Sequence, residues 1–133
     1  MRIDIVPMGA VRMTQRGKWN NPNALRYLNY KQEIAYRLHQ SFYTPRTDAV
    51  SIKVTFYMPI PQSWSKRKRS ASDGMPCMVK PDIDNMIKGV FDAANGVIWK
   101  DDNQVVKVES QKIYSFAPGI EIQVEAISSE HAA

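Results

Sequence analysis

Apolar residues recur at every second position in several stretches of the chain, a spacing that predicts half-buried β-strands. The clearest stretch spans residues 50–58, where every even position is apolar and a proline follows at once. Weaker alternation predicts three further strands, at residues 2–6, 105–108 and 120–126. The turn residues 117–119 lie between the last two strands, so we expect those strands to form a hairpin.

Two other stretches have the three- and four-residue apolar spacing of amphipathic helices. The first spans residues 25–42, and its apolar face consists of Tyr27, Tyr30, Ile34, Leu38 and Phe42. The second spans residues 83–95 and is followed by glycine, a common helix end. Residues 61–80 have no apolar period and contain proline, serine and glycine. We expect them to form a long loop that binds a partner.

The 133 residues are enough for one compact domain. About four strands and two helices predict an α+β fold, with a mixed sheet and both helices packed on one of its faces. We expect residues 1–127 to form this single domain and residues 128–133 to be a frayed tail. The sequence shows neither a membrane-spanning apolar run nor a secretory signal, which favours the cytoplasm.

Positive charge is concentrated in two segments. The chain has 18 lysines and arginines against 13 aspartates and glutamates, a net charge of +5. Residues 12–26 hold four cations and no acid, and residues 61–80 hold five cations and one acid. Clustered cations displace counterions from nucleic acid, so this distribution predicts a polyanionic partner. The alternative is a solvated surface that only keeps the protein soluble.

The sequence lacks the residues that several common kinds of catalytic and cofactor-binding site require. Cys77 is a single cysteine, and His39 and His131 lie far apart in the sequence, which argues against disulfides, thiolate zinc sites and a Ser-His-Asp arrangement. Neither a phosphate-binding lysine loop nor a dinucleotide glycine motif is present, so no nucleotide cofactor is expected. Carboxylates are the remaining candidates for catalysis.

The stretch from Lys80 to Lys88 carries these carboxylates. Pro81 favours an extended entry to the helix, and residues two apart in an extended segment share a face. The side chains of Asp82 and Asp84 are therefore expected side by side, where a raised pKa or a bound cation relieves their repulsion. Hard oxygen ligands of this kind suit Mg²⁺, and Mn²⁺ can replace it.

Two further groups extend the candidate site. Lys88 lies one helical turn after Asp84, where its ammonium group can meet a phosphate oxygen. Asp101 and Asp102 lie on a predicted turn and can supply a third carboxylate from a separate element. The resulting hypothesis is a divalent cation held by three acids beside one lysine.

Each of these residues also has a structural interpretation. Asp82 and Asp84 are typical helix caps, and Asp84 with Lys88 has the spacing of a surface ion pair. Residues 101–103 are typical turn residues. Asp92 lies two turns beyond Asp84, and we interpret it as structural.

The motifs Lys-Pro-Asp-Ile-Asp-Asn at residues 80–85, Phe-Asp-Ala at 91–93 and Trp-Lys-Asp-Asp at 99–102 resemble the RusA family of Holliday junction resolvases, common on prophages. The resemblance implies a homodimeric, Mg²⁺-dependent endonuclease that cuts four-way DNA junctions symmetrically. The metal-site aspartates of the family match Asp82, Asp84 and Asp102, and its catalytic lysine matches Lys88. Some members carry an arginine where Pro81 stands, so a DNA-binding role of that arginine does not transfer.

The residues and the resemblance together predict a structure-specific endodeoxyribonuclease of recombination and repair, acting at the nucleoid of a bacterial or phage-infected cell. The expected DNA-binding residues are Arg12, Arg16, Lys18, Lys66, Arg67, Lys68, Arg69 and Lys80. Two alternatives stay open. One is a non-catalytic DNA-binding module whose acids are caps and turns, and the other is a metal-dependent nuclease for another nucleic acid, RNA included.

Overall fold

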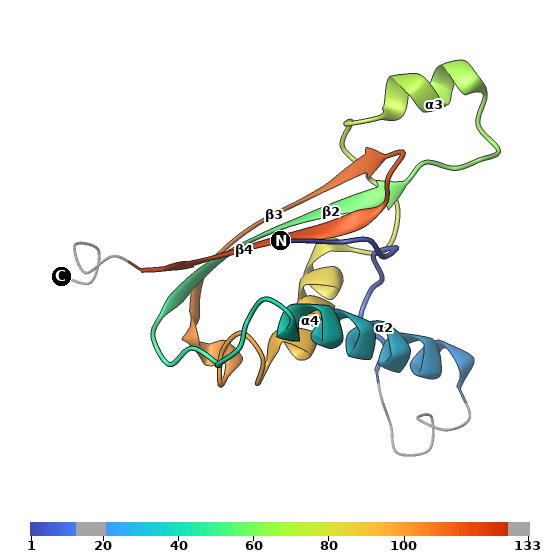
Figure 1. The fold of residues 1–133 in the computed structure, drawn as a ribbon. Helices are drawn as coiled ribbons and strands as arrows, with labels where there is room; N and C mark the ends of the chain where they lie inside the picture. Colours follow the sequence, from blue (N-terminus) through green and yellow to red (C-terminus); the bar gives the residue numbers. More distant parts are fainter. Residues whose placement is uncertain (13–20, 128–133) are drawn as a thin grey trace.

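The structure is a computed structural model that describes residues 1–12 and 21–127. Its elements in chain order are β1 (Arg2–Ile3), α2 (Pro22–His39), β2 (Val50–Pro59), α3 (Lys66–Ser72), α4 (Ile83–Ala94), the 3₁₀ turn η1 (Asp102–Gln104), β3 (Val105–Ser115) and β4 (Gly119–Ala126). Figure 1 shows one sheet with α2 and α4 together on one face. The predicted α+β fold with a mixed four-stranded sheet is confirmed. The predicted tail at 128–133 lies outside the described residues.

The strand order is β1-β4-β2-β3. The central strand β2 pairs antiparallel with β4 and parallel with β3. The predicted hairpin of the last two strands is therefore wrong, because β2 lies between them. Burial explains the order: the even positions of β2 from Val50 to Phe56 are fully buried, and a strand this apolar is best shielded with a neighbour on each side. Turn residues alone do not reveal an intervening strand.

The hydrophobic core lies between the sheet and the two helices on its face. The predicted face of α2 is buried through Tyr27, Tyr30, Ile34 and Leu38. The face of α4 is buried through Met86, Gly89, Val90, Ala93 and Ala94. None of the helices in the described ranges is long and apolar enough to cross a membrane. Packing against both the sheet and α2 fixes α4, whose N-terminus carries Asp82 and Asp84.

A third helix, α3, occupies part of the predicted loop at residues 61–80. The Ser65 hydroxyl caps this helix and accepts a hydrogen bond from the Lys68 N–H at 3.2 Å. No residue of α3 is buried, so its sequence carried no apolar period to reveal it. Figure 1 shows α3 beyond the end of β2, standing away from the two-layered body. The basic run of the sequence is therefore carried on a projecting helix, which corrects the two-helix prediction.

Candidate active site

Asp82 and Asp84 lie at the N-terminus of α4, and both are exposed. Asp82 occupies the N-cap position with extended backbone angles, φ −67° and ψ 145°, but its side chain forms no capping hydrogen bond. One oxygen of Asp84 accepts a hydrogen bond from the neighbouring Asn85 N–H at 2.9 Å. The capping interpretation thus fails for Asp82. Within the part of the chain that the structure describes, its carboxylate oxygens accept no capping hydrogen bond and are open to a ligand.

The sheet holds the chain segment that leads into these aspartates. Lys112 of β3 donates hydrogen bonds from its ammonium group to the carbonyl oxygens of Val79 and Pro81, the latter at 2.6 Å. The Lys112 carbonyl in turn accepts a hydrogen bond from the Cys77 N–H at 3.1 Å. The Lys80–Pro81 peptide bond is cis. Lys112 therefore binds two backbone carbonyl oxygens just before Asp82 and fixes the entry to α4 on the sheet.

Residues 8–11, near the N-terminus of the chain, also contact the start of α4. Asn85 accepts a hydrogen bond from the Ala10 N–H at 3.1 Å through its backbone carbonyl, and its side-chain amide donates one to the Ala10 carbonyl at 3.0 Å. Gly9 passes so close that a Cβ atom there would lie 2.8 Å from the Asn85 amide nitrogen and 2.9 Å from Pro81. A groove of about 600 Å³ lies between residues 8–11 and residues 80–85. Asp82 lines this groove.

Replacing the Asn85 side chain tests whether this contact positions Arg12, one of the residues predicted to bind DNA. Asn85→Ala removes the bond to Ala10, an exposed hydrogen bond worth about 1 kcal/mol or less, so unfolding stability should change little. Junction affinity should fall by up to about fivefold, because Arg12 follows the clamped segment and loses its fixed position. Asn29→Ala, at an exposed position of α2, is the matched control. Filter-binding titrations of both variants would show no difference if the clamp has no role in binding.

Lys88 is exposed and lies one turn after Asp84 on α4. Within the described ranges, the ion pairs join Arg2 to Asp4, Arg37 to Glu33, Arg46 to Asp48 and Lys53 to Glu109. The surface pair of Asp84 with Lys88, an alternative interpretation of the sequence, is therefore not formed. The ammonium group of Lys88 stays available for a phosphate oxygen.

Asp102 lies in η1, eight residues after the end of α4, where it is close enough to Asp92 near that end for their charges to interact. The side chain of Asp101 raises the pKa of Asp102 through a shared hydrogen bond, and slight desolvation and the charge of Asp92 act in the same direction. Asp92 is eight residues beyond Asp84, a rise of about 12 Å along the helix. In the described part of the chain, no group of three acids, histidines or cysteines is placed to hold a metal ion. One chain alone therefore does not bring Asp102 to the other two aspartates.

The other acids near this end have structural partners. The carboxylate of Asp101 accepts a hydrogen bond from the Asn103 N–H at 3.2 Å and completes a capping box with Gln104. Asp92 accepts a hydrogen bond from the Tyr27 hydroxyl at 2.9 Å, which joins α4 to α2. Burial, together with this bond, raises the pKa of Tyr27. Asp92 thus has a structural partner on α2, and Asp101 serves as a cap.

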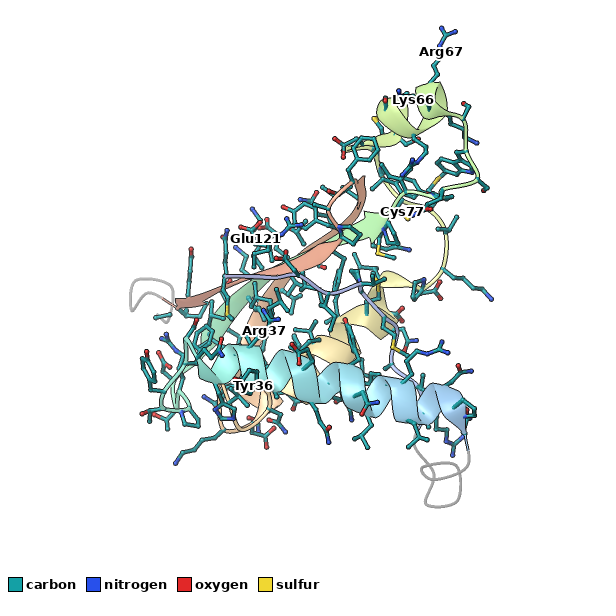
Figure 2. All side chains as sticks on the ribbon, turned by 45° about the vertical axis from the view of Figure 1, so that its right-hand side comes forward. Tyr36, Arg37, Lys66, Arg67, Cys77 and Glu121 are labelled. Carbon is teal, nitrogen blue, oxygen red and sulfur yellow. The ribbon has the colours of Figure 1, made fainter. Side chains whose placement is uncertain are left out.

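The basic residues of α3 divide into two kinds. Lys68 lies with its ammonium nitrogen 4.0 Å from the centre of the Trp64 ring, and the Arg69 guanidinium lies 5.6 Å from that of Phe116. These two residues anchor the helix on aromatic rings. Lys66 and Arg67 are exposed, and Figure 2 shows Arg67 pointing away from the body of the protein. The sequence run alone gave no sign of this division.

Two predicted DNA-binding residues near the site, Arg12 and Lys80, are exposed. Lys80 lines the groove that also contains Asp82, which places a cation within the candidate site. Arg16 and Lys18 lie outside the described residues. Exposed cations are therefore found both at the aspartate pair and on α3.

A small α+β domain with two exposed carboxylates at a helix start, an exposed lysine one turn further along and a projecting cationic helix has the features of an enzyme that acts on nucleic acid phosphodiesters. The family model described as Endodeoxyribonuclease RusA matches residues 3–125. The chain thus belongs to the RusA family, as the motifs predicted, and membership indicates a Holliday junction-resolving endodeoxyribonuclease. It is also similar to "Uncharacterized protein YqaN" of Bacillus subtilis (strain 168), with 37% identity over 130 residues, 92% of this chain and 88% of that protein.

Proposed function

We propose that this protein is a Mg²⁺-dependent, homodimeric endodeoxyribonuclease that resolves four-way DNA junctions by paired symmetric nicks in recombination and repair. The observation that carries the proposal is the free carboxylate of Asp82 at a helix start that it does not cap. A structural aspartate at this position would bond to the backbone N–H groups of the first turn. A ligand-binding aspartate keeps its oxygens free.

Asp82 and Asp84 are the proposed ligands of Mg²⁺, for which Mn²⁺ can substitute. Their exposed, hard oxygens fit such a cation, but the described residues of one chain offer no third acid beside them. Asp102 is the proposed third ligand, supplied by a second copy. When bound, Mg²⁺ lowers the pKa of a bound water and polarises the scissile phosphate.

Lys88 has the proposed role of stabilising charge on the scissile phosphate. In the reaction, the oxygen of a water joins phosphorus, the bond from phosphorus to the 3′ oxygen breaks, and the product carries a 5′-phosphate. Negative charge grows on the phosphoryl oxygens as this occurs. The exposed ammonium group of Lys88, one turn from Asp84 and in none of the ion pairs of the described residues, is placed to neutralise that charge.

The cationic surfaces bind the DNA arms through phosphates. Lys66 and Arg67 project from α3, and Arg12 and Lys80 lie at the aspartate site. Phosphate contacts fix position and orientation without reading bases, which suits an enzyme that recognises a branched shape. A dimer with two-fold symmetry offers one site to each of two opposing strands.

The projecting cations of α3 give a salt-dependence test. Lys66→Ala with Arg67→Ala should reduce the slope of log affinity against log salt by about 1.8, or about 0.9 for each phosphate that is no longer neutralised. Lys31→Ala with Arg37→Ala on α2 removes the same net charge from another surface. Fluorescence anisotropy titrations at several salt concentrations measure the slopes. Equal changes in the two double variants would show that only net charge matters.

Substrate choice separates the proposal from its alternatives. The protein is titrated against a four-way junction, a linear duplex and a hairpin RNA, each with Mg²⁺. We expect cleavage of the junction at concentrations that leave the duplex and the RNA intact. Binding without cleavage would support a non-catalytic module, and preferred cleavage of the RNA would support a nuclease for another nucleic acid.

A further inference from the structure

Two adjacent apolar residues are exposed on the segment that leads into the aspartate site. Met78 is 94% exposed, more than any other large apolar residue in the described part of the chain, and Val79 is 54% exposed. Asp82 follows four residues after Met78, so their Cα atoms lie within about 14 Å of each other. A single exposed apolar side chain is common, whereas neighbouring ones beside a candidate site point to a ligand.

The backbone that carries Met78 and Val79 is held in place. The N–H of the buried Cys77, directly before Met78, donates a hydrogen bond to the Lys112 carbonyl at 3.1 Å. The ammonium group of Lys112 binds the carbonyl oxygens of Val79 and Pro81. Figure 1 shows this stretch leading from α3 to the start of α4. The two side chains are therefore presented from a fixed support, which lowers the entropy cost of packing them against a ligand.

Cations lie on both sides of Met78 and Val79 along the chain. Lys80 follows Val79 directly, is exposed and lines the groove at the aspartate site. Lys66 and Arg67 are exposed on α3, which precedes Met78. Positive groups around an apolar centre suit a polyanion that also has an apolar part. Nucleic acid is such a polyanion, because its phosphates are charged and the faces of its bases are apolar.

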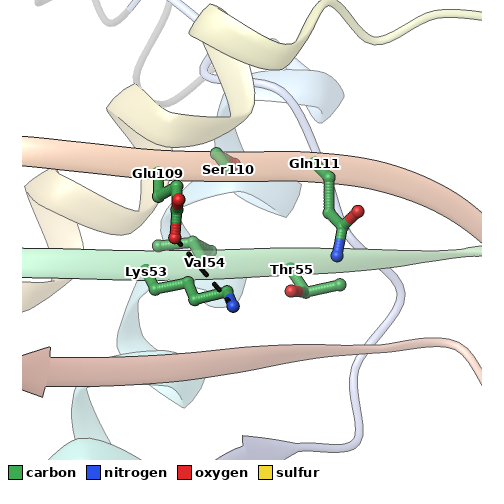
Figure 3. Close-up of a pocket in the computed structure, with 6 residues that line it drawn as sticks. All are labelled: Lys53, Val54, Thr55, Glu109, Ser110 and Gln111. Carbon is green, nitrogen blue, oxygen red and sulfur yellow. Dashed lines mark ion pairs between the residues drawn. The ribbon is translucent and has the colours of Figure 1, made fainter.

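The sheet face turned away from α2 and α4 carries balanced charges instead. Figure 3 shows Lys53 of β2 beside Glu109 of β3, and 3.9 Å separates the ammonium nitrogen from a carboxylate oxygen. Lys107 and Glu125 line a pocket on the same face. Two lysines and two glutamates cancel, so this face attracts a polyanion only weakly. We therefore expect the DNA to follow the surface between α3 and the aspartates.

The centre of a four-way junction offers the base surface that Met78 could contact. Strands change partners there and stacking is interrupted, so a base is separated from its neighbour at lower cost than within a continuous duplex. Methionine is among the apolar residues that proteins insert between base steps. The distance of about 14 Å to Asp82 corresponds to about four base-pair rises. Met78 is thus within reach of bases close to the scissile phosphate.

We propose that Met78, supported by Val79, is an apolar wedge that packs against unstacked bases at the centre of the junction, while Lys80 and the cations of α3 bind the flanking phosphates. The inference rests on the proposed function and names the part of the junction that this site recognises. The wedge enters a junction centre at low cost, but it enters a linear duplex only by unstacking a base step. It therefore favours branched DNA without reading a base sequence.

A fluorescent adenine analogue, quenched by stacking and placed at the centre of an immobile junction, tests the wedge. Binding is measured in Ca²⁺, separately from cleavage. We expect the emission to rise when the wild-type protein binds. Met78→Ala should lose most of this rise and bind the junction about fivefold more weakly, the low end of the loss for one stacking side chain. Its affinity for a linear duplex should not change. Met78→Leu keeps an apolar side chain of similar volume and should behave like the wild type.

Tyr36→Ala is the matched control, because Tyr36 is a large residue of α2 that is 62% exposed. It should change neither the emission nor the affinity. A wild-type complex without a rise in emission would overturn the proposal. So would a Met78→Ala protein that matches the wild type, which would leave Met78 and Val79 as a surface for another protein, or one that loses junction and duplex affinity equally. Wild-type cleavage is scored separately on an unlabelled junction, so the wedge can fail while the nuclease stands.

Discussion

Asp82→Asn is expected to abolish Mg²⁺-dependent junction cleavage and to leave junction binding unchanged. The amide keeps the shape of the side chain but removes its charge, which a hard divalent cation requires. Because Asp82 makes no capping hydrogen bond, the substitution should cost little folding free energy. We expect the cleavage rate to fall on the order of a hundredfold or more, the scale of losing one electrostatic contact in a transition state.

Asp4→Asn is the control for this substitution. Asp4 is also exposed, with 83% of its side chain accessible and one ion pair to Arg2, and it lies far from α4 in the sequence. Single-turnover cleavage on denaturing gels gives the rates, and gel shifts in Ca²⁺ give the binding. An Asp82→Asn protein that cleaves like the control would remove Asp82 from the catalytic site.

The second large effect concerns how the aspartates are shared between copies. Asp82→Asn and Asp102→Asn are each expected to inactivate a homodimer. In a mixed dimer, the intact Asp82 of one chain and the intact Asp102 of the other would form one complete site. Random mixing of the two variants makes half of the dimers mixed. Each mixed dimer has one complete site and one defective site, so roughly a quarter of wild-type nicking should return.

The opposite outcome is equally clear. If each site were built within one chain, every chain in the mixture would carry a defective site and no activity would return. Mixing Asp82→Asn with Asp84→Asn serves as the control, since both defects fall on the same ligand pair. Recovery there as well would show that wild-type contamination, and not a site shared between copies, explains the result.

Helices and strands were predictable from the sequence where one face is buried, because apolar residues then recur at a regular spacing. Residues 50–58 and both long helices follow their apolar spacing, and the structure contains all three. The helix α3 was not predictable, because it buries no residue and is held by rings from Trp64 and Phe116. The strand order was also missed, since pairing partners are chosen by the whole core and not by the turn between two strands.

The candidate site was predictable in its residues but not in its arrangement. The spacing of Asp82, Asp84 and Lys88 placed them together at a helix start, and the structure does so. The spacing did not show that Asp102 stays near the C-terminal end of the same helix, because that depends on the tight turn of residues 95–99, which keeps the chain from returning along α4. The clamp between Asn85 and Ala10 joins segments 75 residues apart and leaves no local pattern.

The most direct test of junction resolution is the cleavage of a synthetic immobile four-way junction by the wild-type protein, with and without Mg²⁺, resolved strand by strand on a denaturing gel. We expect nicks at symmetric positions on two opposing strands, with Mg²⁺ only, while a linear duplex of the same sequence stays intact. A junction that is bound but uncut in Mg²⁺ and in Mn²⁺, or a duplex cut as fast as the junction, would contradict the proposed function.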